Sequence, residues 1–227
     1  SLVKIYYKKA DLIISNSISG KKDLTKICKT NVVNIPSPSF MRLYSKKKIK
    51  EEDELKIISV GRLSKEKGYK TVIDALNRIK IKNFSMKILG DGPEKKNLEN
   101  KIKKYDLRKK IKLIGFKRDT KKYYKEANLF INASLFEGFP NAVVEAISYG
   151  IPVICADCRG GMKEIILNGR GGDFFEVNNA EQLAQKIISF YKDPKKLNQK
   201  LFIARENIKK YSILNHVKKY EDIFKKI

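Results

Sequence analysis

The stretch Glu137-Gly138-Phe139-Pro140-Asn141-Ala142-Val143-Val144-Glu145 is the centre around which the rest of the chain is arranged. It follows an apolar run at 129–134 that is typical of a buried strand, and it opens a helix that continues to Gly150. Pro140 suits the first turn of that helix because its missing N–H costs nothing there, and Asn141 can serve as the cap. The stretch therefore predicts a strand, a loop and a helix in direct succession.

Two carboxylates flank the start of the predicted helix. Glu137 precedes it in the loop, and Glu145 lies about one turn inside it, on the same face as Asn141. The unpaired N–H groups and the dipole of such a helix start attract an anion, and Gly138 lets the backbone approach a ligand closely. The alternative is that Glu137 is a solvated loop residue and Glu145 a surface position of the helix.

Two glutamates with seven residues between them, the Gly-Phe-Pro-Asn run, and the following Ala-Ile-Ser-Tyr-Gly-Ile-Pro-Val-Ile closely resemble the signature of the retaining glycosyltransferases of family four. The resemblance implies the GT-B fold, in which two Rossmann-like domains face each other across a cleft. It implies that Glu145 holds the ribose of a nucleotide-sugar. It also implies that Glu137 and the backbone N–H groups of Phe139, Asn141 and Ala142, in the loop with Gly138 and Pro140, position the donor sugar.

The chain has 227 residues, of which 42% are hydrophobic and 33% charged, enough for one α/β domain and part of another. We expect no signal peptide, and no apolar run approaches the roughly 20 residues that a membrane span needs. Its first residue is Ser1, from which we expect a processed or excised piece of a longer protein. The three cysteines form no disulfide framework, which predicts a reducing cytoplasm.

Lysine and arginine number 50 against 25 acidic residues, so the formal net charge is +25. Such a surface favours nucleic acid, acidic lipid headgroups or phosphorylated substrates. The chain lacks an arginine-rich arm, zinc-finger spacing and aromatic RNP-type motifs, so nucleic acid is the less favoured partner. The excess is mainly lysine spread along the chain, and compositional bias is the alternative explanation. We expect a cytoplasmic protein, peripheral at the inner face of an anionic membrane.

Few residues could bind a metal or take part in histidine-dependent catalysis. Cys155-Ala156-Asp157-Cys158 has C-x-x-C spacing, but it ends a strand and lacks a second ligand pair, so a core cysteine and a loop cysteine are expected. His216 is the one histidine, which excludes a Ser-His-Asp triad and a histidine metal site. A surface or packing role is expected for it.

The order of the segments predicts an α/β protein with a Rossmann-like parallel sheet covered by helices on both faces. Residues 1–40 resemble a remnant of the family's N-terminal, acceptor-binding domain, with strands at 11–17 and 31–35 around a helix at 19–28. A polar linker at 41–54 precedes a nucleotide-sugar-binding domain at 55–210, and a helix at 211–227 resembles the one that crosses back in GT-B proteins. In the main domain, strands are expected at 55–60, 84–89, 111–114, 128–132, 151–155 and 173–177. Helices are expected near 68–80, 93–105, 119–126, 141–149, 161–167, 179–191, 194–209 and 213–226.

The loop after the first strand of this series, Gly61-Arg62-Leu63-Ser64-Lys65-Glu66-Lys67-Gly68, carries two cations that should point toward the cleft. A diphosphate leaving group needs such cations where no metal is bound. The loop resembles the family's Gly-Arg-Leu…Lys-Gly element, which implies that Arg62 and Lys67, beside Gly61, bind the donor's phosphates. The alternative is that both are solvated side chains of a lysine-rich loop.

Three further loops fall in the family's order. Gly90-Asp91-Gly92-Pro93 predicts a tight turn with Pro93 opening a helix, and it does not complete the G-x-G-x-x-G of a dinucleotide site. Gly115-Phe116-Lys117-Arg118 resembles the loop under the nucleobase, with Phe116 or Lys117 nearest, and a core position for Phe116 is the alternative. Gly160-Gly161 begins a Gly-Gly-x-x-Glu element that resembles the family's loop beside the phosphates, where successive N–H groups form an anion nest.

The resemblance implies a retaining hexosyl- or N-acetylhexosaminyltransferase that uses a nucleotide-sugar, expected to be UDP-linked. The acceptor is expected to be a saccharide or a lipid-linked molecule in cell-surface polysaccharide or glycan biosynthesis. We expect neither a metal nor another cofactor. The glycine-rich loop and the acceptor-side histidine that the family supplies from its N-terminal domain are absent, so this chain alone should bind donor weakly and turn over little.

Two other functions stay open. The chain could be a non-catalytic donor-binding subunit completed by another polypeptide. It could also be a basic module on a Rossmann scaffold that binds membranes or nucleic acid, which predicts strongly salt-dependent binding. A nicotinamide dehydrogenase is a more distant alternative.

Overall fold

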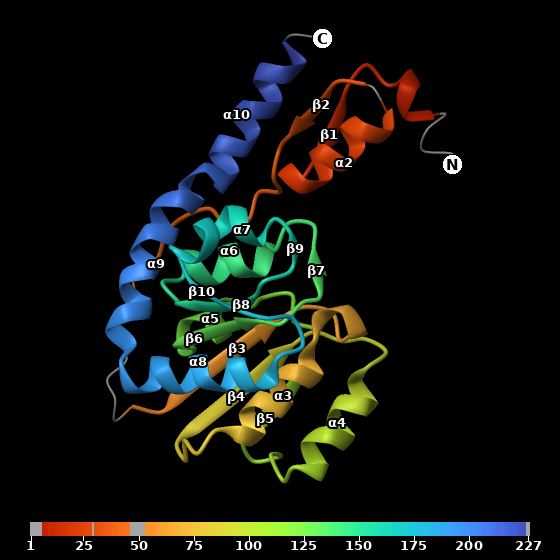
Figure 1. The fold of residues 1–227 in the computed structure, drawn as a ribbon. Coiled ribbons are helices and arrows are strands. Elements are labelled where there is room, and N and C mark those ends of the chain that lie inside the picture. Colours follow the sequence, from red (N-terminus) through yellow and green to blue (C-terminus); the bar gives the residue numbers. More distant parts are fainter. Residues whose placement is uncertain (1–5, 29, 46–52, 226–227) are drawn as a thin grey trace.

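The computed structural model describes residues 6–28, 30–45 and 53–225. Its main feature is a six-stranded sheet in which every neighbouring pair is parallel, in the order β10-β8-β6-β3-β4-β5 (Figure 1). The predicted Rossmann-like parallel sheet is therefore confirmed. The strands are β3 (Leu55–Val60), β4 (Phe84–Leu89), β5 (Ile111–Gly115), β6 (Leu129–Asn132), β8 (Val153–Ala156) and β10 (Asp173–Phe175).

Helices cover both faces of this sheet, as the alternation predicted. One face packs against α3, α4 and α8, and the other against α5, α6, α7 and α9. Successive strand residues belong alternately to the two cores: Ile57 faces the first and Ile58 the second. The strands are mostly apolar because helices cover both of their faces. The helices are α3 (Tyr69–Arg78), α4 (Lys95–Lys104), α5 (Lys121–Glu126), α6 (Asn141–Ser148), α7 (Met162–Ile165), α8 (Ala180–Lys192) and α9 (Pro194–Ile208).

The strand order places β3 and β6 side by side at the centre of the sheet. From β3 the chain runs outward through β4 and β5, and it then returns to β6 and builds the other half. The connections leaving β3 and β6 therefore diverge in opposite directions. Such a topological switch point opens a crevice at the carboxyl ends of the strands, where doubly wound proteins bind ligands.

The N-terminal residues form a small βαβ unit beside this domain. Strands β1 (Ile13–Ser15) and β2 (Val32–Asn34) are parallel and are joined by α2 (Ile18–Cys28), with a 3₁₀ turn η1 (Tyr7–Lys9) before them. The final helix α10 (Ile213–Phe224) runs alongside this unit, and Nδ1 of His216 lies 2.9 Å from the carbonyl oxygen of Pro36 (Figure 1). His216 thus has the packing role expected of it.

The predicted linker at 41–54 is described only at 41–45 and 53–54, and its remainder lies outside the described residues. Its first part packs on the domain: the ring of Tyr44 stacks on Tyr149 with centroids 4.4 Å apart. Arg205 also donates a 2.7 Å hydrogen bond to the Tyr44 carbonyl. Residues 41–45 therefore differ from a solvated linker because an aromatic side chain anchors them.

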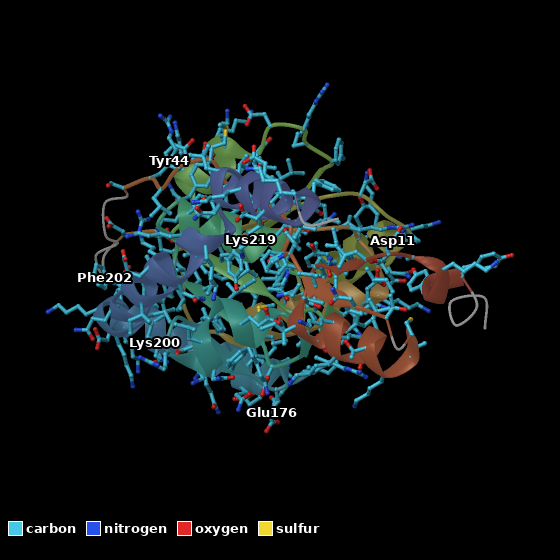
Figure 2. The ribbon with its side chains drawn as sticks, turned by 90° about the horizontal axis from the view of Figure 1, so that it is seen from above. Asp11, Tyr44, Glu176, Lys200, Phe202 and Lys219 are labelled. Carbon is cyan, nitrogen blue, oxygen red and sulfur yellow. The ribbon has the colours of Figure 1, made fainter. Side chains whose placement is uncertain are left out.

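The basic residues are distributed widely over the surface. Seen from above, side chains with nitrogen tips project outward on several sides (Figure 2). Among the helices within the described ranges, none is long and apolar enough to cross a membrane.

Candidate functional site

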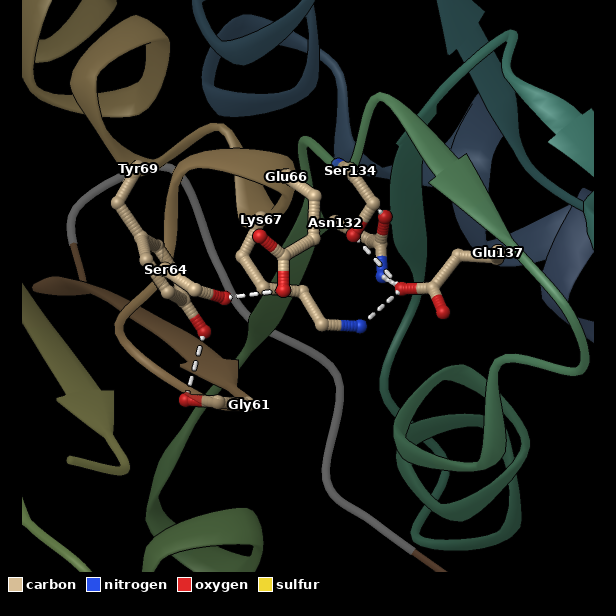
Figure 3. A network of polar contacts seen from close by, with 8 residues as sticks. All are labelled: Gly61, Ser64, Glu66, Lys67, Tyr69, Asn132, Ser134 and Glu137. Atoms are coloured by element: carbon tan, nitrogen blue, oxygen red, sulfur yellow. Dashed lines mark hydrogen bonds and ion pairs between the residues drawn. The ribbon is translucent and has the colours of Figure 1, made fainter. Parts of the chain in front are cut away.

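An ion pair lies at the switch point between β3 and β6. Nζ of Lys67 lies 2.7 Å from Oε1 of Glu137, with side chains 25% and 10% exposed (Figure 3). Lys67 ends the short 3₁₀ turn η2 (Lys65–Lys67), which follows β3. Gly68 has a φ of 64°, and a Cβ there would lie 2.0 Å from the carbonyl oxygen of Ala133. Glycine is therefore required for this turn to close against the end of β6.

The Glu137 carboxylate is held by two further donors. Oγ of Ser134 lies 2.6 Å and Nδ2 of Asn132 lies 3.2 Å from the same Oε1 atom (Figure 3). The sequence analysis did not identify these two residues. Their signal was the presence of polar side chains at the end of an otherwise apolar strand, since a buried polar group needs a partner.

Two short strands hold the Glu137 loop in place. β7 (Phe136–Glu137) pairs with β9 (Arg159–Gly160). Gly160 has a φ of 122°, and a Cβ there would lie 1.5 Å from the carbonyl oxygen of Glu137. The N–H of Gly161 donates to the Gly138 carbonyl at 3.0 Å. The predicted anion nest is therefore wrong for Gly161, whose N–H is already used, and both glycines instead allow close packing of β9 on β7.

The start of α6 differs from the expected cap. Pro140 occupies the cap position with φ −80° and ψ 77°, and Asn141 is the first helical residue. The N–H of Asn141 donates back to the Phe139 carbonyl at 3.0 Å, which forms an inverse γ-turn. The Asn141 side chain accepts a 2.8 Å hydrogen bond from Ser39 and does not cap the helix. Asn141 is thus neither the cap nor an unpaired backbone donor, whereas the N–H groups of Phe139 and Ala142 have no acceptor within the described chain.

Four of the predicted site residues line one cavity of about 460 Å³. Tyr69 donates a 3.1 Å hydrogen bond to the Gly61 carbonyl, which fixes the start of the first loop. Phe116 is 74% exposed at the cavity, which excludes the alternative that it is a core residue. The predicted members are Gly61, Arg62, Phe116 and Lys117, joined by Val60, Leu89, Gly90, Asp91 and Thr120.

The Gly90–Gly92 turn has the structural role expected of it. A Cβ on Gly90, whose φ is 141°, would lie 1.9 Å from the Gly61 carbonyl oxygen, so the turn packs directly beneath the loop after β3. Pro93 lies two residues before α4, in the turn that precedes the helix rather than at its start.

Glu145 lines a neighbouring cavity of about 590 Å³, and Thr120 lines both cavities. The hydroxyl of Tyr124 donates a 3.0 Å hydrogen bond to Oε2 of Glu145. Burial raises the pKa of the Glu145 carboxyl, and the hydrogen bond from Tyr124 opposes that shift. The alternative of an ordinary surface position is therefore wrong for Glu145. Sequence reasoning missed Tyr124 and Thr120, which carry no local pattern.

The C-x-x-C residues lie in the core. Cys155 and Cys158 are buried, and both are free thiols. Burial raises the pKa of Cys158 to about 11 and that of Cys155 well above its ordinary value. Among the residues that the structure describes, no three His, Cys, Asp or Glu side chains gather as a metal-ligand group.

Two contacts join the N-terminal unit to the loop around β9. The N–H of Ile18, at the start of α2, donates to Oε1 of Glu164 at 2.8 Å. Arg159 forms a two-pronged contact with Asp23, at 3.0 and 2.8 Å. The Glu164 and Arg159 side chains thus connect α2 to the segment that flanks the two glycines.

The fold of this chain is similar to that of solved GT-B glycosyltransferases. The Anabaena protein HepE, in a complex with UDP and glucose, matches with a TM-score of 0.85 and 21% identity, covering 96% of this chain and 64% of that one. The TarM protein of S. aureus, in a complex that includes UDP, matches with a TM-score of 0.84 and 22% identity, covering 98% and 45%. The chain therefore has the GT-B α/β fold.

The chain belongs to the glycosyl transferases group 1 family, whose sequence profile matches residues 41–212. It is similar to the N-acetylgalactosamine-N,N'-diacetylbacillosaminyl-diphospho-undecaprenol 4-alpha-N-acetylgalactosaminyltransferase of Campylobacter jejuni, with 32% identity over 92% of this chain and 62% of that protein. It is 33% identical to an uncharacterised glycosyltransferase of Methanocaldococcus jannaschii, over 72% of this chain and 44% of that one. The chain thus spans about half the length of the curated relatives that it matches.

Proposed function

We propose that this protein transfers a sugar from a UDP-linked donor to a saccharide or lipid-linked acceptor, with retention at the anomeric carbon. The observation that carries the proposal is the Lys67–Glu137 pair at the switch point, beside the cavity that Arg62 lines. An anion-binding group and a hydrogen-bond acceptor lie next to each other there, as a sugar diphosphate requires.

The diphosphate would bind at the loop after β3. Arg62 is exposed at the cavity, and within the described ranges it makes no ion pair, so its guanidinium is available to phosphate oxygens. Lys67 is half-buried one turn further on. Two cations fixed near the departing phosphate stabilise the charge that develops there, and a partly dry site strengthens that effect. We propose that Arg62 and Lys67 together stabilise the leaving group without a metal.

The nucleoside would occupy the two cavities that meet at Thr120. Phe116 and Lys117 line the first, at the place expected for the base. Glu145 lines the second, where its carboxylate can accept hydrogen bonds from ribose hydroxyls. Tyr124 orients that carboxylate from behind.

Glu137 would face the donor sugar. Lys67, Ser134 and Asn132 all contact Oε1, and Figure 3 shows the other carboxylate oxygen pointing away from them. That oxygen can accept a hydrogen bond from a sugar hydroxyl. Glu137 then acts as a positioning and stabilising group rather than a covalent nucleophile. The acceptor attacks from the face that the diphosphate leaves, and the departing phosphate takes the acceptor's proton.

The acceptor proposal rests on charge and on relatives. The Campylobacter jejuni relative is named for a diphospho-undecaprenol substrate, and a Salmonella typhimurium relative for colanic acid biosynthesis. A net charge of +25 would hold the protein at an anionic membrane surface, where lipid-linked acceptors are found. We therefore propose a peripheral place on the cytoplasmic face of the membrane.

Calorimetric titration with UDP, GDP and UDP-sugars in the presence of EDTA tests the donor site. Arg62→Ala and Glu145→Ala should each weaken UDP binding by about 1–3 kcal/mol, because each removes a charged hydrogen-bonding partner. Arg108→Ala is the matched control. It removes an exposed arginine that precedes β5 and therefore lies at the amino-terminal ends of the strands, away from the cavities, so UDP affinity should not change.

The other functions would give different results. One such result is that the chain binds the donor without hydrolysing or transferring it, even after the remainder of a full-length relative is supplied. That result would favour a non-catalytic subunit. Strongly salt-dependent binding to DNA or anionic vesicles that Glu145→Ala leaves unchanged, together with no nucleotide binding, would favour the basic module.

A further inference from the structure

Three donors converge on one oxygen of Glu137, and two of them are neutral. From this geometry we propose that Ser134 and Asn132 are positioning residues that hold the Glu137 carboxylate for the donor sugar independently of Lys67. The proposal rests on the donor-site function set out above. It assigns to these two residues a role that none of the motifs in the sequence indicated.

The two neutral donors are rigidly placed. Asn132 is the last residue of β6, which lies between β3 and β8 inside the sheet. Asn132 and Ser134 are 8% and 1% exposed, so neither side chain can exchange its partner for water. Oδ1 of Asn132 also accepts a 3.0 Å hydrogen bond from the Ser134 N–H. That bond orients the amide so that its Nδ2 group faces Glu137.

Lys67 is a less permanent partner. Its side chain is 25% exposed and extends from a 3₁₀ turn rather than from a strand. A bound diphosphate would compete with Glu137 for its ammonium group. A carboxylate that is only 10% exposed would then lose its cation, and an uncompensated buried charge is costly. The 2.6 Å bond from Ser134 and the 3.2 Å bond from Asn132 remain in place and offset part of that cost.

The neutral donors and Lys67 therefore have different roles. Because the neutral donors occupy Oε1, the carboxylate keeps one orientation whether Lys67 faces Glu137 or the phosphates. Ser134 and Asn132 should therefore determine how much the sugar adds to donor affinity, whereas Lys67 should determine how much the diphosphate contributes.

The test compares the dissociation constants of UDP and UDP-N-acetylglucosamine, measured by calorimetry on the full 227-residue chain, in wild type and variants. Ser134→Ala should weaken binding of UDP-N-acetylglucosamine about tenfold to a hundredfold, the value of one hydrogen bond to a charged group, and should leave UDP within about twofold. Lys67→Ala should weaken both ligands by the same factor, so that their ratio is unchanged.

Ser59→Ala is the matched control. Ser59 is 2% exposed on β3, and its hydroxyl donates to the Ile131 carbonyl of the neighbouring strand rather than to Glu137. The same substitution at the same depth should leave the ratio unchanged. If Ser134→Ala does not fold, as judged by its thermal transition, Asn132→Ala removes the other neutral donor and should shift the ratio in the same direction.

The outcomes are distinguishable. The inference is overturned if Ser134→Ala and Asn132→Ala weaken UDP and the UDP-sugar equally, or if Ser59→Ala shifts the ratio as much. It is also overturned if Lys67→Ala alone abolishes the contribution of the sugar. Failure of the wild type to bind either UDP or UDP-N-acetylglucosamine would instead overturn the donor-site function itself.

Discussion

The backbone N–H of Ile18 donates a 2.8 Å hydrogen bond to Oε1 of Glu164, which lies 146 positions further along the chain. A carboxylate from the main domain thereby satisfies one of the unpaired donors at the start of α2, in the N-terminal unit. It also places a negative charge at the positive end of that helix. The attachment of the βαβ unit thus depends on a cap from another part of the fold.

Glu164→Ala should loosen this attachment. Loss of a helix cap costs about 1 kcal/mol, so amide hydrogen exchange in α2 (Ile18–Cys28) should become roughly fivefold faster. In Glu164→Gln, which keeps an acceptor oxygen, the exchange rate of α2 should lie between the rates in Glu164→Ala and in wild type. Exchange in β3 and β6 serves as the internal reference. An equal acceleration in those strands would mean that Glu164 supports the whole domain rather than the N-terminal unit.

The partly buried Glu145 should make stability depend on pH. Burial raises its pKa above the ordinary value of 4.5, so the folded state binds more protons than the unfolded state between the two values. The contribution of this group to stability is therefore complete below about pH 4.5 and is lost as pH rises through the raised pKa. Glu145→Gln should be more stable than wild type at pH 7, and the difference should vanish toward acid pH.

Urea unfolding between pH 4 and 8 measures this difference. Glu99→Gln, at an exposed position of α4, is the control and should show no pH-dependent gain. A constant difference at every pH would show that packing, rather than ionisation of Glu145, distinguishes the variant. A gain in stability combined with loss of UDP affinity would be the usual trade-off at a functional site.

Gly160 should tolerate alanine far less well than Gly115. Both have positive φ, at 122° and 78°, so both substitutions carry backbone strain of about 1–2 kcal/mol. A Cβ on Gly115 meets no atom within 4 Å, whereas one on Gly160 would lie 1.5 Å from the Glu137 carbonyl oxygen. Gly160→Ala should therefore lose clearly more unfolding free energy and separate β9 from β7. Equal losses in urea unfolding would show that β7 moves aside without cost.

The two core cysteines should be unreactive in the folded protein. With the pKa of Cys158 raised to about 11, only about one molecule in a thousand carries its thiolate at pH 8. Cys155 has no exposed surface at all. Labelling with a disulfide reagent at pH 8 should be slow for the native protein and fast in 8 M urea. Rapid labelling of Cys155 or Cys158 in the native protein, or a disulfide between them, would contradict their burial in the core.

The architecture of the main domain was predictable because its strands are buried on both faces. Runs such as 55–60 and 129–132 are mostly apolar, with Lys56, Ser59 and Asn132 as the exceptions, and helical patterns alternate with them, which is typical of a parallel sheet covered on both faces. The cavity members Arg62 and Phe116 were predictable for a related reason: loops after parallel strands meet at one edge of the sheet.

The remaining details depend on contacts that no local pattern encodes. The hydrogen bonds of Ser134 and Asn132 require a carboxylate that approaches from a loop whose path is set by β7 and β9. The expected cap at Asn141 failed because Pro140 closes a γ-turn that uses the Asn141 N–H. The anion nest expected at Gly161 does not form, because the Gly161 N–H already donates a hydrogen bond to the Gly138 carbonyl.

The central adjacency of β3 and β6 also sets an order of events during synthesis. Strands β3, β4 and β5 are neighbours both in sequence and in space, so they can pair as they emerge. Lys67 is then in place, but Glu137 is separated from it by 70 positions, and the loop between them must close before the pair can form. A nascent chain would therefore acquire the cations that we propose to bind phosphate well before it acquires the carboxylate that we propose to recognise the sugar. Discrimination between UDP and a UDP-sugar would thus report that the second half of the sheet has assembled.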